Sequence, residues 1–192
     1  MVEKTRCSWC TSDPIYIRYH DEEWGVPLRD DRALFELLCL EGQQAGLSWL
    51  TVLKKRSHYR RVFAGFVPEK IARFSDDKLE EILLDPGVVR NRLKLYGIRT
   101  NALAMLALQQ ELGSFSEFLW QFVGGETVRG HDADHAPVTS TPASDAMSKA
   151  LKKRGFTFVG TTICYAFMQA SGMVDDHRPG CWKQRKRQRA AE

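Results

Sequence analysis

The chain has 192 residues, of which 43% are hydrophobic and 27% are charged, as is usual for a soluble globular protein. This composition excludes a disordered chain, a collagen-like chain and a disulfide-stabilised mini-protein. The net charge of +4 comes entirely from residues 182–192, so the charge of the rest of the chain is weak evidence for a nucleic-acid partner.

The sequence shows no targeting or membrane-spanning segment. No apolar run is long enough for a transmembrane helix, and the first residues, MVEKTRCSWC, lack the apolar stretch of a signal peptide. We therefore expect a cytoplasmic protein without a membrane partner. Five cysteines, an odd number, argue against a disulfide framework and favour free thiols or metal ligands.

Helical periodicity dominates the first half of the chain. Residues 34–41 repeat at i, i+3, i+4 and i+7, with Asp30 or Asp31 as the N-cap. A second helix begins at Trp49 after the cap Ser48 and runs towards Phe63. A third follows the cap Ser75 and ends at residues 86–87, Pro-Gly. Together these signals predict a succession of short helices.

The second half continues the pattern. A helix through residues 103–106 ends near Gly113, and residues 115–122 carry a phenylalanine and leucine stripe. Residues 124–143 are rich in Gly, Pro, Ser and Thr and predict a long loop. A helix starting at Ser144 or Asp145 and a last helix ending at Gly172 follow.

We expect an all-α fold in which residues 1–181 form one domain. Only residues 157–159 look briefly extended, and no internal repeat or interdomain linker is visible. Residues 182–192 form a basic tail that we expect to be disordered in isolation. Basic clusters at 54–61, 90–94 and 149–154 are more often solvated helix faces than binding sites.

Soft metal ligands gather near the two ends of the chain. They are Cys7, Cys10 and His20 at one end and His177 and Cys181 at the other. Thiolate and imidazole suit tetrahedral zinc, and such a site would be structural because it leaves no open position. The alternative is that these side chains pack as ordinary core residues. His131 and His135 in the long loop suggest exposed side chains, without support for a metal role.

The sequence predicts a helical hairpin near the C-terminus. A basic amphipathic helix leads into a turn from Gly155 to Gly160, and a second helix begins at Thr161 or Thr162. The free N–H groups at the start of the second helix favour an anion, and Lys153 stands beside the turn. This layout fits a sequence-independent phosphate clamp. A plain helical hairpin with solvated lysines fits it equally well.

Glu41 occupies an apolar position of its helix stripe. A buried carboxylate is costly without partners, so Glu41 is either a pocket residue that accepts hydrogen bonds from a ligand or an exposed residue where the helix ends at Gly42. Aromatic side chains near the N-terminus make a pocket conceivable, although they could also anchor the terminus: Trp9, Tyr16, Tyr19 and Trp24.

Long motifs of this chain resemble the DNA-3-methyladenine glycosylase I family. They are RCSWC, DPIYIRYHDEEWGVP, CLEGQQAGLSWLTVLKKR and TSTPASDAMSKALKKRGFTFVGTTICYAFMQASGMVDDH with the cysteine that follows. The resemblance extends from Cys7 to Cys181. It implies an all-α fold of the helix–hairpin–helix glycosylase superfamily, with a structural zinc ion that joins the N- and C-terminal segments, and excision of 3-methyladenine from double-stranded alkylated DNA.

The resemblance also implies roles for individual residues. The implied zinc ligands are Cys7, His20, His177 and Cys181, which leaves Cys10 as a free thiol. Glu41 would read the adenine edge, and the implied walls of the base pocket are Tyr16, Tyr19, Trp49, Trp9 and Trp24. The hairpin would hold the DNA backbone through Gly155, Gly160, Thr161 and Lys153. Leu47 is either a wedge into the gap left by the flipped base or a core leucine.

The expected chemistry suits these residues. Methylation at N3 gives the base a positive charge and weakens the glycosidic bond, so base flipping into a cation-preferring pocket matters more than a strong general acid. Electron-rich rings contribute about 0.5–2 kcal/mol each to cation binding. No lysine stands at the start of the second helix, so we expect a monofunctional enzyme without lyase activity. Binding of a single lesion by a helix–hairpin–helix needs no dimer symmetry, so we expect a monomer.

Alternatives remain at this point. Asp175, in the string Val-Asp-Asp-His, either assists attack by water or supports the neighbouring His177. A zinc-stabilised DNA-binding module without catalysis and a helical scaffold for a protein partner are the competing functions. Only the enzyme would release free base and lose that activity on Glu41→Gln.

Overall fold

The computed structural model describes residues 4–130 and 138–184. The residues Arg185–Glu192 of the expected tail and the loop histidines His131 and His135 lie outside the described residues. The structure is mostly helical, which confirms the all-α prediction. Its elements are α1 (Pro14–Glu22), α2 (Asp31–Gln44), α3 (Trp49–Val62), η1 (Ala64–Phe66), α4 (Pro68–Ile71), α5 (Asp76–Leu84), α6 (Arg92–Leu112), α7 (Phe115–Trp120), η2 (Gln121–Val123), β1 (Val128–Arg129), α8 (Pro142–Lys153), α9 (Thr161–Ala170) and β2 (Val174–Asp175).

The helix caps are where local sequence places them. The side chain of Asp30 accepts the N–H of Ala33 at 2.8 Å, and Ser48 accepts that of Thr51 at 3.2 Å. Ser75 caps α5 in the same way. Each cap satisfies an N–H group that has no partner within the helix, which confirms the predicted starts of three helices.

Four local features differ from the expectation. Helix α1 was not predicted, although Asp13 caps it and Pro14 opens its first turn. Helix α8 begins at Pro142, earlier than expected, because Thr141 and Ser144 form a reciprocal capping box. Residues 157–159 form no strand. Two-residue strands β1 and β2 pair in parallel, with Val128 opposite Val174, so the expected loop contributes a short ladder.

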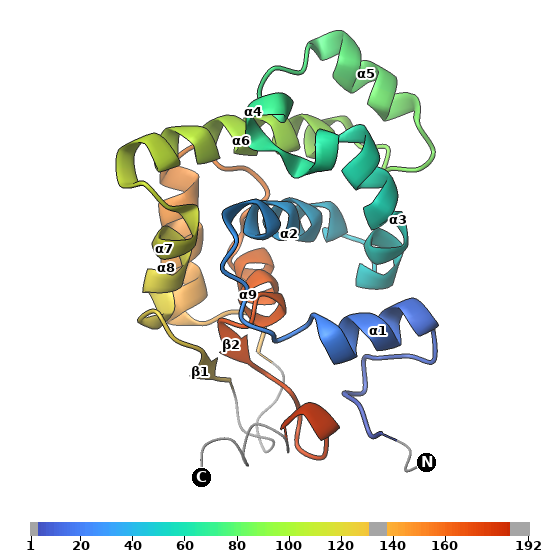
Figure 1. Cartoon of the computed structure of the whole chain (residues 1–192), viewed down its shortest axis with the longest axis vertical. Coiled ribbons are helices and arrows are strands. Elements are labelled where there is room, and N and C mark those ends of the chain that lie inside the picture. The colour runs from blue at the N-terminus through green and yellow to red at the C-terminus, as the bar shows by residue number, and fades with distance from the viewer. Residues whose placement is uncertain (1–3, 131–137, 185–192) are drawn as a thin grey trace.

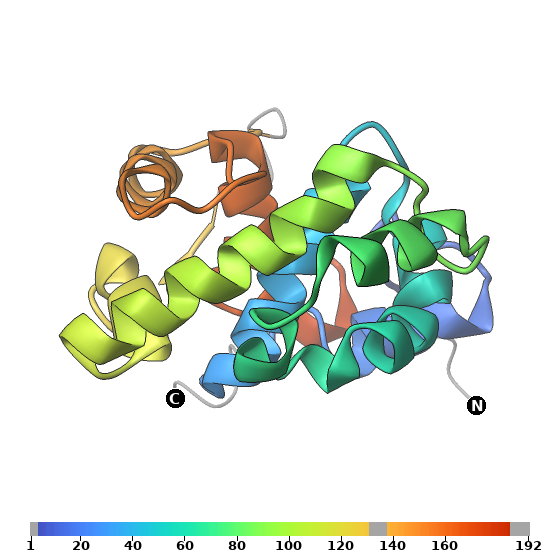
Figure 2. The same cartoon turned by 90° about the horizontal axis from the view of Figure 1, so that it is seen from above.

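Helix α2 lies at the centre of the molecule and packs against α3, α6 and α9 (Figure 1). Figure 2 shows the long α6 crossing the molecule between the α8–α9 pair and helices α3–α5. These helices enclose a continuous apolar core. Its largest buried side chains include Trp120, Tyr59, Phe35, Phe63 and Phe167. Since α2 carries Glu41, the core holds that residue on a helix fixed from several sides.

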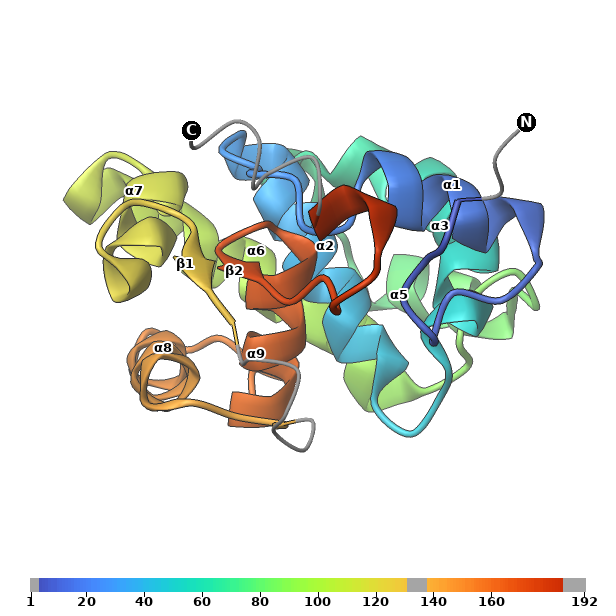
Figure 3. The same cartoon turned by 90° about the horizontal axis from the view of Figure 1, so that it is seen from below.

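The two ends of the described chain come together below α2. In Figure 3 the segment before α1 and the segment after β2 lie side by side. The N–H of Trp182 donates to the carbonyl of Thr5 at 2.9 Å, and Lys183 Nζ donates to the carbonyl of Asp21 at 2.9 Å. No helix in residues 4–130 and 138–184 has both the length and the apolar character that a membrane crossing requires.

Candidate functional site

A buried cluster of four soft ligands lies where the chain ends meet. It contains Cys7, His20, His177 and Cys181, whose ligand atoms all lie within 4.8 Å of one another. Cys181 Sγ lies 3.4 Å from His20 Nε2 and 3.6 Å from His177 Nδ1. Cys7 Sγ lies 3.6 Å from His177 Nδ1. The separate sequence clusters therefore converge on one point.

The donor set and its spacing fit a tetrahedral metal ion. Zinc bonds of about 2.3 Å to sulfur and 2.0–2.1 Å to nitrogen place neighbouring ligand atoms about 3.5 Å apart. Burial lowers the pKa of His177 to about 4, so its imidazole is neutral and can donate a lone pair. The cluster could therefore hold a metal ion between the two ends of the fold.

The outer nitrogens of both histidines are also engaged. His20 Nδ1 lies 2.8 Å from Asp21 Oδ1, and His177 Nε2 lies 3.3 Å from the carbonyl of Trp24. Such contacts orient imidazoles whose other nitrogen faces a metal. Cys10 lies apart: its Sγ is 3.7 Å from the carbonyls of Thr11 and Tyr16, and it does not belong to the four-residue cluster.

Five aromatic side chains form a connected group beside the metal cluster. Ring centroids of Trp9 lie 5.1 Å from Tyr16, 6.4 Å from Tyr19 and 5.0 Å from Trp24. Tyr19 in turn lies 5.4 Å from Trp49. The N-terminal segment, α1, the residues just after it and the start of α3 thus bring together the five aromatic residues that the resemblance implies for a base pocket. The ring centroids of Trp24 and His177 lie 4.7 Å apart in an edge-to-face arrangement, so Trp24 connects the aromatic group to the metal cluster.

Glu41 is buried near this aromatic group. The residue is only 4% exposed, and within the described part of the chain its side chain forms no hydrogen bond or ion pair. The alternative in which α2 ends at Gly42 is therefore wrong, because the helix continues to Gln44. Burial raises the pKa of Glu41 to about 8. Burial and then the Glu41 charge raise the pKa of Tyr19, so the two side chains are close enough to interact.

A second unpartnered polar group belongs to the same region. The indole Nε1 of Trp49 is the only fully buried side-chain nitrogen or oxygen in the described residues without a hydrogen-bond partner. A fully buried N–H without a partner is rare in folded proteins because it costs free energy, and the Glu41 carboxylate has no hydrogen-bond partner in the described residues either. Together they mark a place where a polar ligand would complete the hydrogen bonding.

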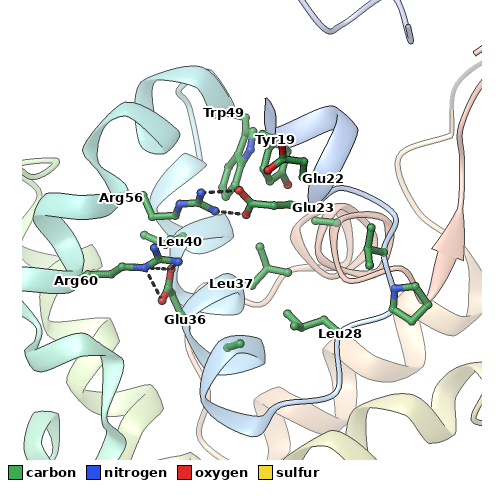
Figure 4. A pocket seen from close by; sticks show the side chains of 14 residues that line it. Tyr19, Glu22, Glu23, Leu28, Glu36, Leu37, Leu40, Trp49, Arg56 and Arg60 are labelled. Carbon is green, nitrogen blue, oxygen red and sulfur yellow. Dashed lines mark hydrogen bonds and ion pairs between the residues drawn. The ribbon is translucent and has the colours of Figure 1, made fainter. Parts of the chain in front are cut away.

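A pocket of about 300 Å³ opens beside Tyr19 and Trp49 (Figure 4). Its floor is apolar, with Leu28, Leu37 and Leu40, and Glu41 does not line it. Bidentate ion pairs stand at its rim, between Arg56 and Glu23 and between Arg60 and Glu36. Lys54 pairs with Asp13 at 2.7 Å. Several cations of the 54–61 cluster are therefore neutralised by acidic neighbours.

Lys94 was expected in a solvated basic cluster, but the structure buries it. Its Nζ donates to the carbonyl of Gln43 at 2.9 Å and to that of Ala45 at 2.5 Å. Gln43 returns a hydrogen bond from Nε2 to the carbonyl of Lys94 at 3.0 Å. Lys94 therefore caps the C-terminal end of the helix that carries Glu41. Its position on the same stripe of α6 as Ile98 and Asn101, which are also buried, was the signal available in the sequence.

The α8–α9 hairpin presents the features expected of it. Gly155 is exposed and has a φ of +86°, and Lys153 is exposed at the end of α8. The first N–H groups of a helix have no intrahelical acceptors, and Gly160 offers those of α9 no side-chain cap. The hydroxyl of Thr161 donates to Asp145 Oδ1 at 2.5 Å, which leaves only the backbone N–H of Thr161 for an outside partner.

Two other sequence candidates have clear positions. Leu47 is 41% exposed in the turn between α2 and α3, and it is therefore not a core leucine. Asp175 lies in β2, and its Oδ1 accepts the N–H of His177 at 3.3 Å. That contact supports the interpretation in which Asp175 holds the segment that carries His177.

Comparisons with known proteins agree on one family. A family model described as methyladenine glycosylase matches residues 9–184. DNA-3-methyladenine glycosylase 1 of Escherichia coli K12 is 53% identical over 178 residues, covering 92% of this chain and 95% of the relative. DNA-3-methyladenine glycosylase of Haemophilus influenzae is 51% identical over 178 residues, covering 92% of this chain and 96% of the relative.

Solved structures give the same result. A crystal structure of 3-methyladenine DNA glycosylase I is similar with a TM-score of 0.90 and 56% identity, covering 93% of this chain and 98% of that one. A structure of 3-methyladenine DNA glycosylase I from Staphylococcus aureus, described as the structural basis of 3-methyladenine recognition, has a TM-score of 0.88 and 41% identity. It covers 92% of this chain and 95% of that one.

Proposed function

The chain belongs to the methyladenine glycosylase family, and from this premise we propose that it excises 3-methyladenine from alkylated double-stranded DNA. The observation that carries the proposal is Glu41, a buried carboxylate without a partner beside an aromatic group. A flipped cationic base would supply both the charge and the N–H donors that this carboxylate lacks.

The proposed recognition follows from the charge of the lesion. Methylation at N3 places a positive charge on the base while it is still bonded to the sugar. Glu41 accepts from the exocyclic amine, and the faces of Tyr16, Tyr19 and Trp49 attract the cationic ring, with Trp9 completing the wall. Trp24 supports this wall from behind, because its indole packs on His177. An unmodified, neutral adenine gains much less from the same groups.

The proposed reaction is hydrolysis without lyase chemistry. The methylated base leaves as a neutral molecule, so the pocket need not supply a strong acid, and water completes the reaction at the sugar carbon. A lyase would need a free amine with a lowered pKa. Burial does lower the pKa of Lys94, but its ammonium donates to two backbone carbonyls and is held away from a nucleophilic role.

We further propose that the metal cluster holds zinc in a structural role. The ligands Cys7, His20, His177 and Cys181 would fill a tetrahedral site and leave no position for substrate. Zinc bound there supplies folding free energy. Since Trp24 and Trp9 both pack on the ligand histidines, the site would also hold the wall of the base pocket in place.

The hairpin is the proposed contact with the DNA backbone. The free N–H groups at Thr161 and the start of α9 favour a phosphate, Gly155 and Gly160 allow a close approach, and Lys153 adds charge. Leu47, exposed beside the helix that carries Glu41, would fill the gap left by the flipped base.

The experiment that tests the proposed function is base release from methylated duplex DNA. Wild-type protein should release free 3-methyladenine, and Glu41→Gln should lose most of that activity. Glu69→Gln, which removes an exposed carboxylate of α4, is the matched control and should retain it. A folded wild-type protein that releases no base would contradict the proposal and favour a non-catalytic DNA-binding module.

A further inference from the structure

The tip of the α8–α9 hairpin carries a residue in an unfavourable backbone conformation. Phe158 has a φ of +56°, in the left-handed region that residues with a Cβ atom seldom adopt. Such a conformation persists only where the surroundings hold it in place, and it often marks a functional constraint. The contacts around Phe158 show what holds it.

Phe158 docks against two glycines on different helices. A Cβ atom at Gly42 of α2 would lie 3.0 Å from Phe158 Cβ, and one at Gly97 of α6 would lie 3.0 Å from Phe158 Cδ2. Both distances are tighter than nine in ten real Cβ contacts. Glycine at both positions therefore allows the hairpin tip to sit directly on the two helices.

Hydrogen bonds hold the same tip on either side of Phe158. Thr157 donates its N–H to Asn101 Oδ1 at 2.7 Å, and Asn101 Nδ2 donates to the carbonyl of Thr157 at 3.1 Å. Ser148 Oγ donates to the carbonyl of Val159 at 2.6 Å. Because Asn101 and Gly97 belong to α6, the hairpin, α6 and α2 form one connected unit.

The docking point on α2 is adjacent to Glu41. Gly42 follows Glu41 in the chain, and Lys94 of α6 caps the end of the same helix. Glu41 makes no hydrogen bond within residues 4–130 and 138–184, so the backbone of α2 decides where its carboxylate lies. A shift of the hairpin against Gly42 would therefore move the carboxylate.

We propose that Phe158 is a positioning residue that couples the hairpin to Glu41, so that a hairpin seated on the DNA backbone aligns the carboxylate with the flipped base. This inference rests on the proposed function. Displacements of an ångström or less at a reacting group can reduce rates strongly, so a small misfit at Phe158 should reduce excision without removing either binding surface.

Three variants test the coupling. Gly42→Ala places a methyl group against Phe158, Phe158→Gly removes the docked ring while allowing the same φ, and the double variant combines them. Single-turnover release of 3-methyladenine should fall about tenfold in each single variant. Binding of free 3-methyladenine, followed by tryptophan fluorescence, and binding of abasic-site duplex should each change less than threefold. Phe158→Tyr should retain most of the rate.

The double variant and a destabilised control make the test specific. Since Phe158→Gly removes the atom that the new methyl group would strike, the double variant should be no slower than Phe158→Gly alone. Leu79→Ala, in the buried face of α5, should lower the melting temperature. At assay temperatures well below that melting temperature, its excision rate should equal that of wild type.

Several outcomes would overturn the inference. The inference is wrong if Gly42→Ala and Phe158→Gly release 3-methyladenine at the wild-type rate. It is also wrong if the rate losses of the two single variants add in the double variant. A rate loss that is matched by an equal loss of free-base binding would indicate damage to the pocket alone. If wild-type protein releases no base, the proposed function and the inference both fail, whereas release by wild type with unchanged variants contradicts the inference alone.

Discussion

Cys181 Sγ lies 3.4 Å from His20 Nε2, although the two residues come from opposite ends of the chain. Around this contact the N-terminal segment, α1 and the segment after β2 meet at one point. The ring of Trp9 lies 5.2 Å from His20, so the aromatic group rests on the metal cluster. The stability of the cluster and the shape of the aromatic group proposed as the base pocket are thus physically linked.

Zinc content should depend on this contact. Wild-type protein should contain about one zinc ion per chain, and Cys181→Ser should lose most of it, because a tetrahedral structural site needs all four ligands. Metal analysis measures the content, and thermal unfolding should show a melting temperature lower by about 10 °C or more, since metal binding contributes folding free energy. Cys10→Ser is the control, and a zinc content equally reduced there would assign Cys10 to the site.

The stability of the ligand-free protein should depend on Glu41 and pH. Burial raises the pKa of Glu41 from 4.5 to about 8, so ionisation destabilises the folded state. The penalty is absent below pH 4.5 and grows until about pH 8. Glu41→Gln should therefore be more stable than wild type by about 3 kcal/mol at pH 7. Denaturant unfolding across this pH range measures the difference, and a difference that does not shrink towards pH 4.5 would contradict it.

Lys153 should act on DNA affinity without regard to sequence. Lys153→Gln should weaken binding to undamaged and abasic duplex alike by about threefold. The slope of the logarithm of the binding constant against the logarithm of the salt concentration should become less steep by about one, as expected for one lost phosphate contact. Titrations at several salt concentrations check both quantities. Lys70→Gln, at an exposed lysine of α4, should leave them unchanged. A loss confined to one DNA sequence would argue against a phosphate contact.

Leu47 should matter for the flipped state of the base. Leu47→Ala should reduce single-turnover excision by about tenfold while preserving binding of free 3-methyladenine, because the wedge acts on the DNA rather than on the released base. Leu84→Ala, at another exposed leucine (79% exposed), is the control. Equal rates for Leu47→Ala and wild type would remove the wedge from the mechanism.

Lys94 should stabilise the end of α2. Lys94→Met keeps the apolar stem but leaves the carbonyls of Gln43 and Ala45 without their donor. Buried groups deprived of a charged partner cost about 2–3 kcal/mol, and chemical unfolding should show a loss of that size. If the variant is as stable as wild type, water replaces the ammonium and Lys94 does not hold the helix.

Helix starts were predictable because they depend on local chemistry. Asp30, Ser48 and Ser75 each cap the N–H groups that lie three positions ahead, so the signal is contained within one turn of chain. Helix α1 carries its own cap but only a short stripe of apolar residues, which is why periodicity did not reveal it. The resemblance to a family implied a ligand set and a set of pocket residues that local patterns left open.

Other features depended on contacts between distant segments. The residues alone could not separate Cys10 from Cys7 and Cys181 as a candidate ligand. Which thiols lie beside the two histidines is decided by where the N-terminal segment, α1 and the C-terminal segment meet. The basic cluster at residues 90–94 also predicted a solvated face for Lys94, whereas the packing of α2 on α6 buries this side chain. Likewise the left-handed Phe158 has no local signal, since its side chain lies against Gly42 and Gly97 and the neighbouring Thr157 is bonded to Asn101, all distant in the sequence.

The sequence by itself determined the helical class, most helix boundaries and the family, because capping and apolar periodicity act over a few neighbouring residues and the family motifs are long. Tertiary structure alone decided which thiols meet which imidazoles, which charges are paired, and how Glu41 comes to be buried without a partner. These properties depend on distances between segments far apart in the chain. The packing of α2 against its neighbouring helices and the meeting of the two chain ends beside α1 set those distances.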